Sequence, residues 1–496
     1  ARAALASDLA RLMARALPPA DLTRHPAAFP VVVDRERAGC AAWYEMFPRS
    51  QSPVPGRHGT FADAARALPR IAALGFDVVY LPPIHPVGRT QRKGRNNALT
   101  AGPDAPGSPW AIGSEAGGHT AIEPRLGTFD EFAQFVGCAR DLGLEVALDY
   151  ALQCSPDHPW VRAHPDWFFR RADGTIRYAE NPPKKYEDIY PLNFWCDDYR
   201  ALWAACRDIL LFWIARGVRT FRVDNPHTKP FAFWEWVIGE VQAAHPDVIF
   251  LAEAFTRPAR MQGLAKLGFT QSYTYFTWRN TAWELREYLT ELTRTQMVEY
   301  FRPNFFTNTP DILHAYLQTG GRPAFLVRLI LAATLSPLYG IYSGFELCEN
   351  RPVRPDSEEY LDSEKYEIRV RDWRAPGNLD AEVALVNRIR RENPALRRLS
   401  NLAFVDVDND QMLCYHRHAP GNDLLVVVTL DPHRPQETTV PIPLEALGLA
   451  SDAPFTVEDL LTGTPYTWRG ARNFIRLDPA ERVAHIFRVQ RSGAAA

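Results

Sequence analysis

Three carboxylic acids in this chain each follow a short apolar run of the kind that forms buried strands. Asp224 ends one run, Glu253 follows a second and Asp311 follows a third. If these strands are parallel and close into a barrel, their carboxyl ends meet at one end of it and the three acids converge. Carboxylates repel one another, so a fold accepts such a cluster only where a ligand or a reaction requires it. The pattern predicts glycosyl transfer through an oxocarbenium-like transition state.

Arg222 lies two residues before Asp224 on the same predicted strand. Residues at i and i+2 face the same side of a strand, so the guanidinium and the carboxylate are expected to be neighbours. A nearby cation favours the ionised form of a carboxylate. We therefore expect Arg222 to keep Asp224 ionised and oriented.

Eight apolar runs, separated by longer helical segments, are available to position these acids. Helices are predicted at 128–142 and 199–216, among others. The predicted strands are 42–47, 78–84, 145–150, 220–225, 248–255, 269–276, 304–308 and 337–343. Strands that alternate with helices in this way predict an α/β fold, a (β/α)8 TIM barrel. The irregular stretch at about 153–196, after the third strand, is expected to be an insertion over the barrel mouth, because loops of this length are usually functional.

The two ends of the chain differ from this central part. Leucines 5, 9, 12 and 17 predict an amphipathic helix at the N-terminus, and a helix at 381–397 is expected to close the barrel. Strands are then predicted at 402–407, 412–417 and 424–430, with a hairpin turn at 408–410. We predict an N-terminal helical segment (1–38, the remnant of a larger region), a catalytic barrel (39–398) and a C-terminal β-sandwich domain (399–496).

The composition excludes several classes of function. The net charge of -2, with mixed acidic and basic residues, gives no sign of a nucleic-acid partner. No apolar stretch approaches the roughly 18 residues that would predict a membrane span. The seven cysteines are scattered and form no CxxC pair, which favours reduced thiols and a cytoplasmic location. No metal and no cofactor is predicted, because neither a His/Cys cluster with ligand spacing nor a glycine-rich nucleotide loop is present in the sequence.

Several longer phrases carry a family resemblance. They are QRKGRNN at 91–97, LQCSPDHPW at 152–160, ENPPKKY at 180–186, DNPHTK at 224–229, NTPD at 308–311 and DLLTG at 459–463. With strand-end acids in the order Asp, Glu, Asp, the chain resembles glycoside hydrolase family 13, the α-amylase superfamily. Within it, the chain is most similar to the bacterial α-1,4-glucan:maltose-1-phosphate maltosyltransferases, from about residue 43 to its end.

Two departures from ordinary amylases bear on the reaction. Amylases usually carry Asn-His after the third strand, where this chain has Gln153-Cys154, and His-Asp after the seventh, where it has Pro310-Asp311. Both replacements match the maltosyltransferase branch, and losing both histidines removes donors to the sugar at the cleavage subsite. Two alternatives stay open. One is an α-glucan hydrolase of the same family, in which water resolves the intermediate. The other is a non-catalytic glucan-binding relative, which would be expected to have lost acids of this triad.

The resemblance implies a retaining glycosyltransferase that moves maltosyl units from α-maltose 1-phosphate to the non-reducing end of α-1,4-glucans. Asp224 would attack the anomeric carbon and form a covalent maltosyl-enzyme. Glu253 would first protonate the leaving phosphate and then deprotonate the 4-hydroxyl of the acceptor. Asp311 would hydrogen-bond the reacting ring and stabilise its developing charge. A homodimer is also implied, through the family's N-terminal region, of which residues 1–17 are expected to be a remnant.

The same resemblance suggests the binding residues. For the donor sugars we expect Lys93, Asn97, Gln153 and Asp188, and for the phosphate Ser108, Asn181, Lys184, Tyr186 and Asn225. Ammonium, hydroxyl and amide donors suit a phosphate dianion. Lys93 and Gln153 occupy positions that the family uses, whereas Asp188 could equally be structural. Lys184 could also belong to a solvated charge pair, and Ser108 to a plain turn.

Three other side chains have open assignments. His119 could touch the substrate or make a local backbone bond, and His227 could line the acceptor side. Cys154 is expected to pack rather than react, because the sequence shows no histidine partner for it.

Overall fold

The computed structural model describes residues 7–16, 32–182, 184–445, 447–450 and 454–490. The chain divides into two compact units, Ala1–Asp34 and Arg35–Ala496. The first unit contains helix α1 (Ser7–Ala16), which falls within the predicted N-terminal helix. Leu5 and Leu17, which contributed to that prediction, lie outside the described residues. Among the described helices, none is long and apolar enough to cross a membrane.

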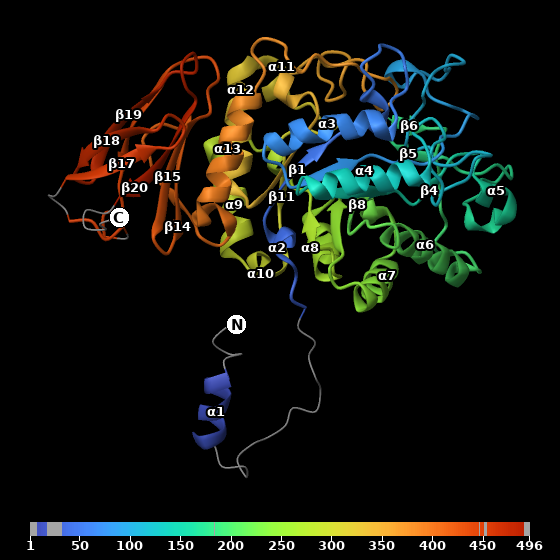
Figure 1. Ribbon diagram of the computed structural model, residues 1–496, viewed down its shortest axis with the longest axis horizontal. Helices are drawn as coiled ribbons and strands as arrows, with labels where there is room; N and C mark the ends of the chain where they lie inside the picture. Colours follow the sequence, from blue (N-terminus) through green and yellow to red (C-terminus); the bar gives the residue numbers. More distant parts are fainter. Residues whose placement is uncertain (1–6, 17–31, 183, 446, 451–453, 491–496) are drawn as a thin grey trace. The chain divides into compact units, whose positions relative to one another are not determined.

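Eight parallel strands form the centre of the second unit (Figure 1). They pair in the order β10-β9-β8-β3-β2-β1-β12-β11, and a bridge between Ser272 and Pro303 joins the two outer strands, which closes the barrel. Most of their residues are buried on both faces, as expected of parallel strands covered by helices. The strands are β1 (Ala41–Glu45), β2 (Val78–Leu81), β3 (Glu145–Tyr150), β8 (Thr220–Asp224), β9 (Ile249–Glu253), β10 (Gln271–Ser272), β11 (Asn304–Phe306) and β12 (Leu338–Tyr342).

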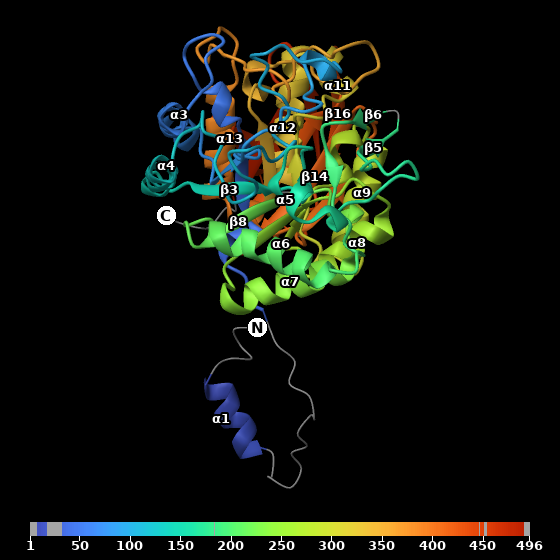
Figure 2. The ribbon, with the colours of Figure 1, turned by 90° about the vertical axis from the view of Figure 1, so that its right-hand side faces the viewer.

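Helices follow the strands and surround the barrel (Figures 1 and 2). Three of them begin with a capping box, at Thr60, Thr128 and Thr281, which satisfies backbone amides of the first turn. The longer helices are α3 (Phe61–Ala73), α4 (Phe129–Asp141), α6 (Tyr199–Ile214), α7 (Phe231–Ala244), α8 (Pro258–Lys266), α9 (Ala282–Arg294), α12 (Gly321–Leu335) and α13 (Asp380–Glu392). The shorter helices are α2 (Glu36–Gly39), α10 (Met297–Tyr300) and α11 (Ala315–Thr319).

The segment between β3 and α6 forms the expected insertion. It contains the short helix α5 (Pro159–Ala163) and two small antiparallel pairs. Strand β4 (Gln153–Cys154) pairs with β7 (Tyr190–Pro191), and β5 (Ala179–Asn181) pairs with β6 (Lys184–Tyr186). This arrangement places two predicted phosphate ligands, Asn181 and Lys184, opposite each other in register.

The C-terminal part is an antiparallel all-β domain (Figure 1). A six-stranded sheet in the order β13-β14-β15-β20-β17-β18 is accompanied by the two-stranded sheet β16-β19. Val427, Val440, Phe455 and Leu477 belong to one hydrophobic core that contains residues of both sheets. The strands are β13 (Leu402–Val405), β14 (Met412–Ala419), β15 (Asn422–Thr429), β16 (Gln436–Pro441), β17 (Pro454–Asp459), β18 (Thr464–Arg469), β19 (Arg472–Leu477) and β20 (Ala484–Gln490). The predicted barrel and C-terminal β-domain are both confirmed.

Two predicted elements were wrong in extent. The strand expected at 269–276 shrinks to β10, because the chain turns after Ser272 and forms the 3-10 helix η6 (Tyr275–Trp278), capped by Thr274. The helix expected at 381–397 ends at Glu392 and is followed by the separate 3-10 helix η8 (Pro394–Arg397). Pro394 has no amide hydrogen and cannot continue an α-helix, which explains the break.

Candidate active site

Arg222 lies at the centre of a carboxylate cluster at the carboxyl ends of β3, β8 and β9. Its Nη1 atom lies 2.8 Å from Asp224 Oδ1 and 3.0 Å from Asp149 Oδ2, and its Nη2 atom lies 3.6 Å from Glu253 Oε1. Strand register causes this meeting, because Asp149 pairs with Arg222 and Asp224 pairs with Glu253 on neighbouring strands. Only 7% of the Arg222 side chain is exposed, so its charge is little screened by water.

The residue after the cluster, Asn225, contacts both acids of the predicted pair. Its backbone adopts a left-handed conformation with φ 43°, which asparagine tolerates better than most residues. Its backbone amide donates to Glu253 Oε2 at 3.1 Å, and its side-chain amide donates to Asp224 Oδ2 at 3.4 Å. Lys229 reinforces this turn by donating to the carbonyl oxygens of Asp224 and Asn225.

Glu253 has the environment of an acid that holds its proton at neutral pH. Burial raises the pKa of Glu253 to about 8; Arg222 opposes this rise, and the charges of Asp224 and Asp311 add to it. A general acid works best when its pKa lies near the working pH. The raised pKa of Glu253 is thus compatible with the predicted role of proton donor.

Two further acids at strand ends were missed by the sequence reasoning. Asp149, near the end of β3, accepts hydrogen bonds from Tyr80, from Trp110 Nε1 at 3.2 Å and from Arg222. Burial raises its pKa to about 7, against the opposing effect of Arg222. Glu45, the last residue of β1, is buried, and burial raises its pKa well above the usual value. The sequence reasoning missed both because the strands predicted at 42–47 and 145–150 extend past these acids.

Asp311 follows β11 and belongs to a chain of four charges. Lys365 Nζ contacts Asp311 and lies 2.6 Å from Glu359 Oε2, and the other oxygen of Glu359 pairs with Lys184. Burial alone would raise the pKa of Asp311, but the Lys365 ammonium outweighs it and holds the pKa below its usual value. Asp311 is thus kept ionised, as a residue that stabilises positive charge on a sugar ring must be. Sequence reasoning did not identify Lys365 or Glu359.

The predicted donor-sugar residues fall into three places. Lys93 and Asp188 are both buried. Lys93 pairs with Glu187, the residue before Asp188. Burial raises the pKa of Asp188 to about 6, and the nearby charge of Lys93 opposes this rise. Neither carboxylate oxygen of Asp188 has a partner among the described residues. Gln153 lies at the start of β4 and donates to the Trp110 carbonyl at 3.5 Å. Asn97 has a left-handed backbone (φ 64°), and its buried Oδ1 has no partner in the described part of the chain.

Tyr366 lies within electrostatic range of acids from two predicted sets. Burial raises its pKa; Lys365 lowers it, and Glu359, Asp311 and Asp188 add to the rise. Asp188, predicted to bind the donor sugars, and Asp311, predicted to be catalytic, therefore both act on this phenol, although they are far apart in the sequence.

The predicted phosphate residues are partly assembled. Asn225 contacts Asp224 and Glu253, and Lys184 reaches Asp311 through Glu359 and Lys365. Burial raises the pKa of Tyr186, and the charge of Asp311 adds to it, which places this phenol near the site. Ser108 is buried, and its Oγ accepts from the Trp110 amide at 3.3 Å. Asn181 is exposed, and its link to the set is its register opposite Lys184.

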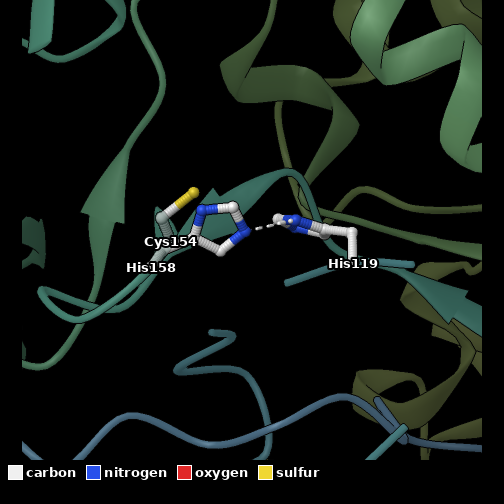
Figure 3. Close-up of side chains that lie close together, drawn as sticks. All are labelled: His119, Cys154 and His158. Atoms are coloured by element: carbon white, nitrogen blue, oxygen red, sulfur yellow. Dashed lines mark hydrogen bonds between the residues drawn. The ribbon is translucent and has the colours of Figure 1, made fainter. Parts of the chain in front are cut away.

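His119, Cys154 and His158 meet in the interior, although their sequence spacing gave no sign of it (Figure 3). Their ligand atoms lie within 4.8 Å of one another, a separation at which a metal ion is geometrically conceivable. Each ring nitrogen is already hydrogen-bonded, however. The Trp160 amide donates to His158 Nδ1, His158 Nε2 lies 3.1 Å from His119 Nδ1, and His119 Nε2 lies 3.0 Å from the Ala151 carbonyl. Two neutral rings satisfy this pattern completely.

These histidines thus support the segment that carries Gln153 and are too buried to meet a substrate. Burial lowers the pKa of His119 well below its usual value and that of His158 to about 3, so both rings are neutral. Burial raises the pKa of the Cys154 thiol well above its usual value, which leaves it unreactive. His227 is half-buried beside Lys229, and burial lowers its pKa to about 4.

Solved structures with the same architecture define the class of fold. An α-amylase from Lactobacillus plantarum superposes with a TM-score of 0.70 at 21% identity, covering 92% of this chain and 100% of that one. A maltogenic α-amylase from Thermotoga neapolitana gives a TM-score of 0.71 at 18% identity over 91% of this chain and 99% of its own. The fold is that of the α-amylase barrels with a C-terminal β-domain.

Sequence comparison then identifies the family. Residues 404–489 match the family described as "GLGE, C-terminal". The α-1,4-glucan:maltose-1-phosphate maltosyltransferase of Chlorobaculum tepidum is 55% identical over 496 residues, covering 98% of this chain and 74% of that protein. The α-1,4-glucan:maltose-1-phosphate maltosyltransferase 2 of Streptomyces coelicolor is 58% identical over 500 residues, with the same coverage. This chain belongs to the α-1,4-glucan:maltose-1-phosphate maltosyltransferase family.

Proposed function

We propose that this enzyme transfers maltosyl units from α-maltose 1-phosphate to the non-reducing end of α-1,4-glucans and releases phosphate. The observation that carries the proposal is the position of Asp224 and Glu253 beside the same Arg222 guanidinium, at 2.8 and 3.6 Å, in a chain of this family. Burial raises the pKa of Glu253 to about 8, which favours its acid form. A nucleophile beside a cation and an acid with a raised pKa are the two groups that retaining glycosyl transfer requires.

The reaction follows from these charges. Asp224 attacks the anomeric carbon of the maltosyl unit while Glu253 gives its proton to the departing phosphate, which leaves a covalent maltosyl-Asp224 intermediate. Glu253, now ionised, accepts the proton of the acceptor 4-hydroxyl, and the glucan oxygen displaces Asp224. Positive charge on the sugar ring grows in both steps, and the ionised Asp311 stabilises it.

We assign donor recognition to the residues predicted from the sequence. Lys184, Tyr186, Asn181, Asn225 and Ser108 bind the phosphate, and Lys93, Asn97, Gln153 and Asp188 bind the two sugars. The partnerless carboxylate oxygens of Asp188 and the partnerless Oδ1 of Asn97 support the sugar assignment, because sugar hydroxyls can donate to such acceptors. The position of Lys184, linked to Asp311 by three successive ion pairs through Glu359 and Lys365, supports the phosphate assignment.

The oligomeric state and the cellular location that we propose are those predicted from the sequence. We expect a homodimer, which sedimentation of the purified chain would test. A cytoplasmic location is supported by the seven cysteines, all of which are free in the structure.

Phosphate release from α-maltose 1-phosphate, measured with and without a short maltooligosaccharide, tests the proposal directly. Release that depends on the acceptor, with products longer by two hexoses by mass spectrometry, is the expected result. Maltose without elongation would indicate hydrolysis. Cleavage of glucan without any use of the phosphorylated donor would refute the assignment.

A further inference from the structure

Glu359 lies between the two lysines of the four-charge chain. Its Oε1 atom pairs with Lys184 Nζ, and its Oε2 atom lies 2.6 Å from Lys365 Nζ. Lys365 continues the chain to Asp311. Each carboxylate oxygen of Glu359 thus neutralises a different ammonium, and one of these ammonium groups belongs to the lysine to which we assign the phosphate.

The loop after β12 holds Glu359 in this place. Its backbone amide donates to Ser357 Oγ at 3.1 Å, and its carbonyl accepts from the Val353 amide at 2.8 Å. The Glu359 side chain is 21% exposed and that of Lys365 only 7%, while Lys184 is 39% exposed. Lys184 is therefore the end of the chain that an incoming ligand can reach, and Lys365 is the fixed end.

We infer that Glu359 is a specificity-determining positioning residue that competes with the phosphate of the donor for Lys184. This inference rests on the proposed function, because it takes Lys184 as a phosphate ligand. Without a ligand, Glu359 occupies the Lys184 ammonium and keeps it near the site. When a phosphate dianion arrives, it takes over Lys184, and the Glu359 carboxylate is left beside another anion.

The consequence is a weakened hold on phosphate after the reaction. A carboxylate close to a bound dianion raises its free energy, because like charges repel at short range. When phosphate departs, Lys184 pairs with Glu359 again, so the lysine charge does not remain without a partner. Glu359 thus favours release of the product anion, whereas the sugar contacts of the intact donor are unaffected by it.

Replacement of Glu359 by glutamine tests the inference, because it keeps the size and one acceptor oxygen but removes the charge. We expect the dissociation constant of inorganic phosphate, measured by calorimetry on the full chain, to fall about tenfold, the order of effect for removing one nearby charge that water screens strongly. Product inhibition by phosphate should strengthen to a similar degree. The KM for glucan should change less than twofold.

Two variants serve as controls. Glu358→Gln removes the same charge one residue away, where Glu358 Oε1 accepts from Trp278 Nε1 at 2.8 Å and no lysine pairs with it in the described structure. This variant should leave phosphate binding within twofold. Glu359→Asp keeps the charge, so its dissociation constant for phosphate should be close to that of the wild type. The urea midpoint of each variant, compared with the wild type, shows whether the fold is intact.

The outcomes separate the inference from the proposed function. Unchanged or weaker phosphate binding by a folded E359Q variant would overturn the inference, even if the wild type transfers maltosyl units. Equal effects of E359Q and E358Q would also overturn it, because they would indicate general electrostatics. Tighter phosphate binding by E359Q alone would support it, and if the wild type then failed to transfer maltosyl units, only the proposed function would fall.

Discussion

Replacing Arg222 by glutamine removes the guanidinium that lies between Asp149, Asp224 and Glu253. The side chain is almost fully buried, and its two terminal nitrogens lie 2.8 to 3.6 Å from the three carboxyl groups. Glutamine is shorter than arginine and can donate hydrogen bonds from one amide nitrogen, but it carries no charge. The variant therefore leaves three acids in a buried site without their shared cation.

The cost to stability follows from the loss of that cation. Removing one partner of a buried ion pair typically destabilises a protein by about 3–5 kcal/mol. The cost depends on pH through Asp149, whose pKa is already raised to about 7 by burial against the effect of Arg222. A folded-state pKa above the unfolded value makes stability fall as pH rises, until the folded-state carboxyl ionises.

In the wild type, the contribution of Asp149 to this fall in stability ends near pH 7, where its carboxyl group ionises in the folded state. In R222Q the pKa of Asp149 rises further, because the cation that lowered it is gone, so the fall continues above pH 7. The difference in free energy of unfolding between the two proteins should therefore widen between pH 7 and 9, by about 1.4 kcal/mol for each pH unit. Urea denaturation at pH 6, 7, 8 and 9 measures this difference.

Activity reports the second role of Arg222, the orientation of Asp224. A charge-assisted hydrogen bond contributes about 1.5–3 kcal/mol, so kcat/KM for phosphate release should fall between about tenfold and 150-fold in R222Q. The matched variant Arg222→Lys keeps the charge but has one nitrogen instead of a fork, so it should recover stability and little activity. An R222Q protein with wild-type stability at pH 8 and kcat/KM within threefold would refute this reasoning.

Three other outcomes are expected. Asp224→Ala should abolish phosphate release and maltosyl transfer in a protein that still folds, because Arg222 keeps Asp149 and Glu253 as partners, and wild-type turnover would contradict its role as nucleophile. Lys184→Ala should raise the KM for α-maltose 1-phosphate about tenfold, the effect of losing one charge-assisted contact, and that for glucan less than twofold. The exposed neighbour Lys185 provides the control, and equal effects on both substrates would argue against a phosphate ligand. Phosphate release should decline as pH rises through about 8, because Glu253 then loses the proton it donates; a flat profile to pH 9.5 would exclude it as the acid.

Much of the barrel could be predicted from the sequence because its strands are short, apolar and buried. The run that ends in Asp224 has five buried residues, and the strand-end rule that selected this acid also brings Glu253 into register with it. Glu45 and Asp149 were missed because the strands predicted at 42–47 and 145–150 extend past them, so neither acid stood at a predicted strand end.

The charges above the barrel could not be predicted in this way. Glu359 and Lys365 lie in a loop after β12, where no periodicity or turn pattern assigns a role to a charged residue. Their pairing with Lys184 depends on the meeting of two loops that are distant in sequence. The same holds for His119, which is separated by 39 residues from its partner His158.

The way the barrel closes has a consequence for its motions. Between β8 and β9 five residue pairs are in register, but β10 and β11 are joined by a bridge at Ser272 and Pro303. Proline has no amide hydrogen, so the Ser272 amide, which donates to the Arg302 carbonyl, supplies the backbone bond here. Side-chain bonds from Asn304 to Gln271 and from Arg302 to the Thr270 carbonyl add to it. Local opening at this junction breaks few backbone bonds, so amide hydrogens there should exchange with solvent sooner than those of β8. Strands β8 and β9, which carry Asp224 and Glu253, can then stay rigid while β11, which precedes Asp311, moves relative to them.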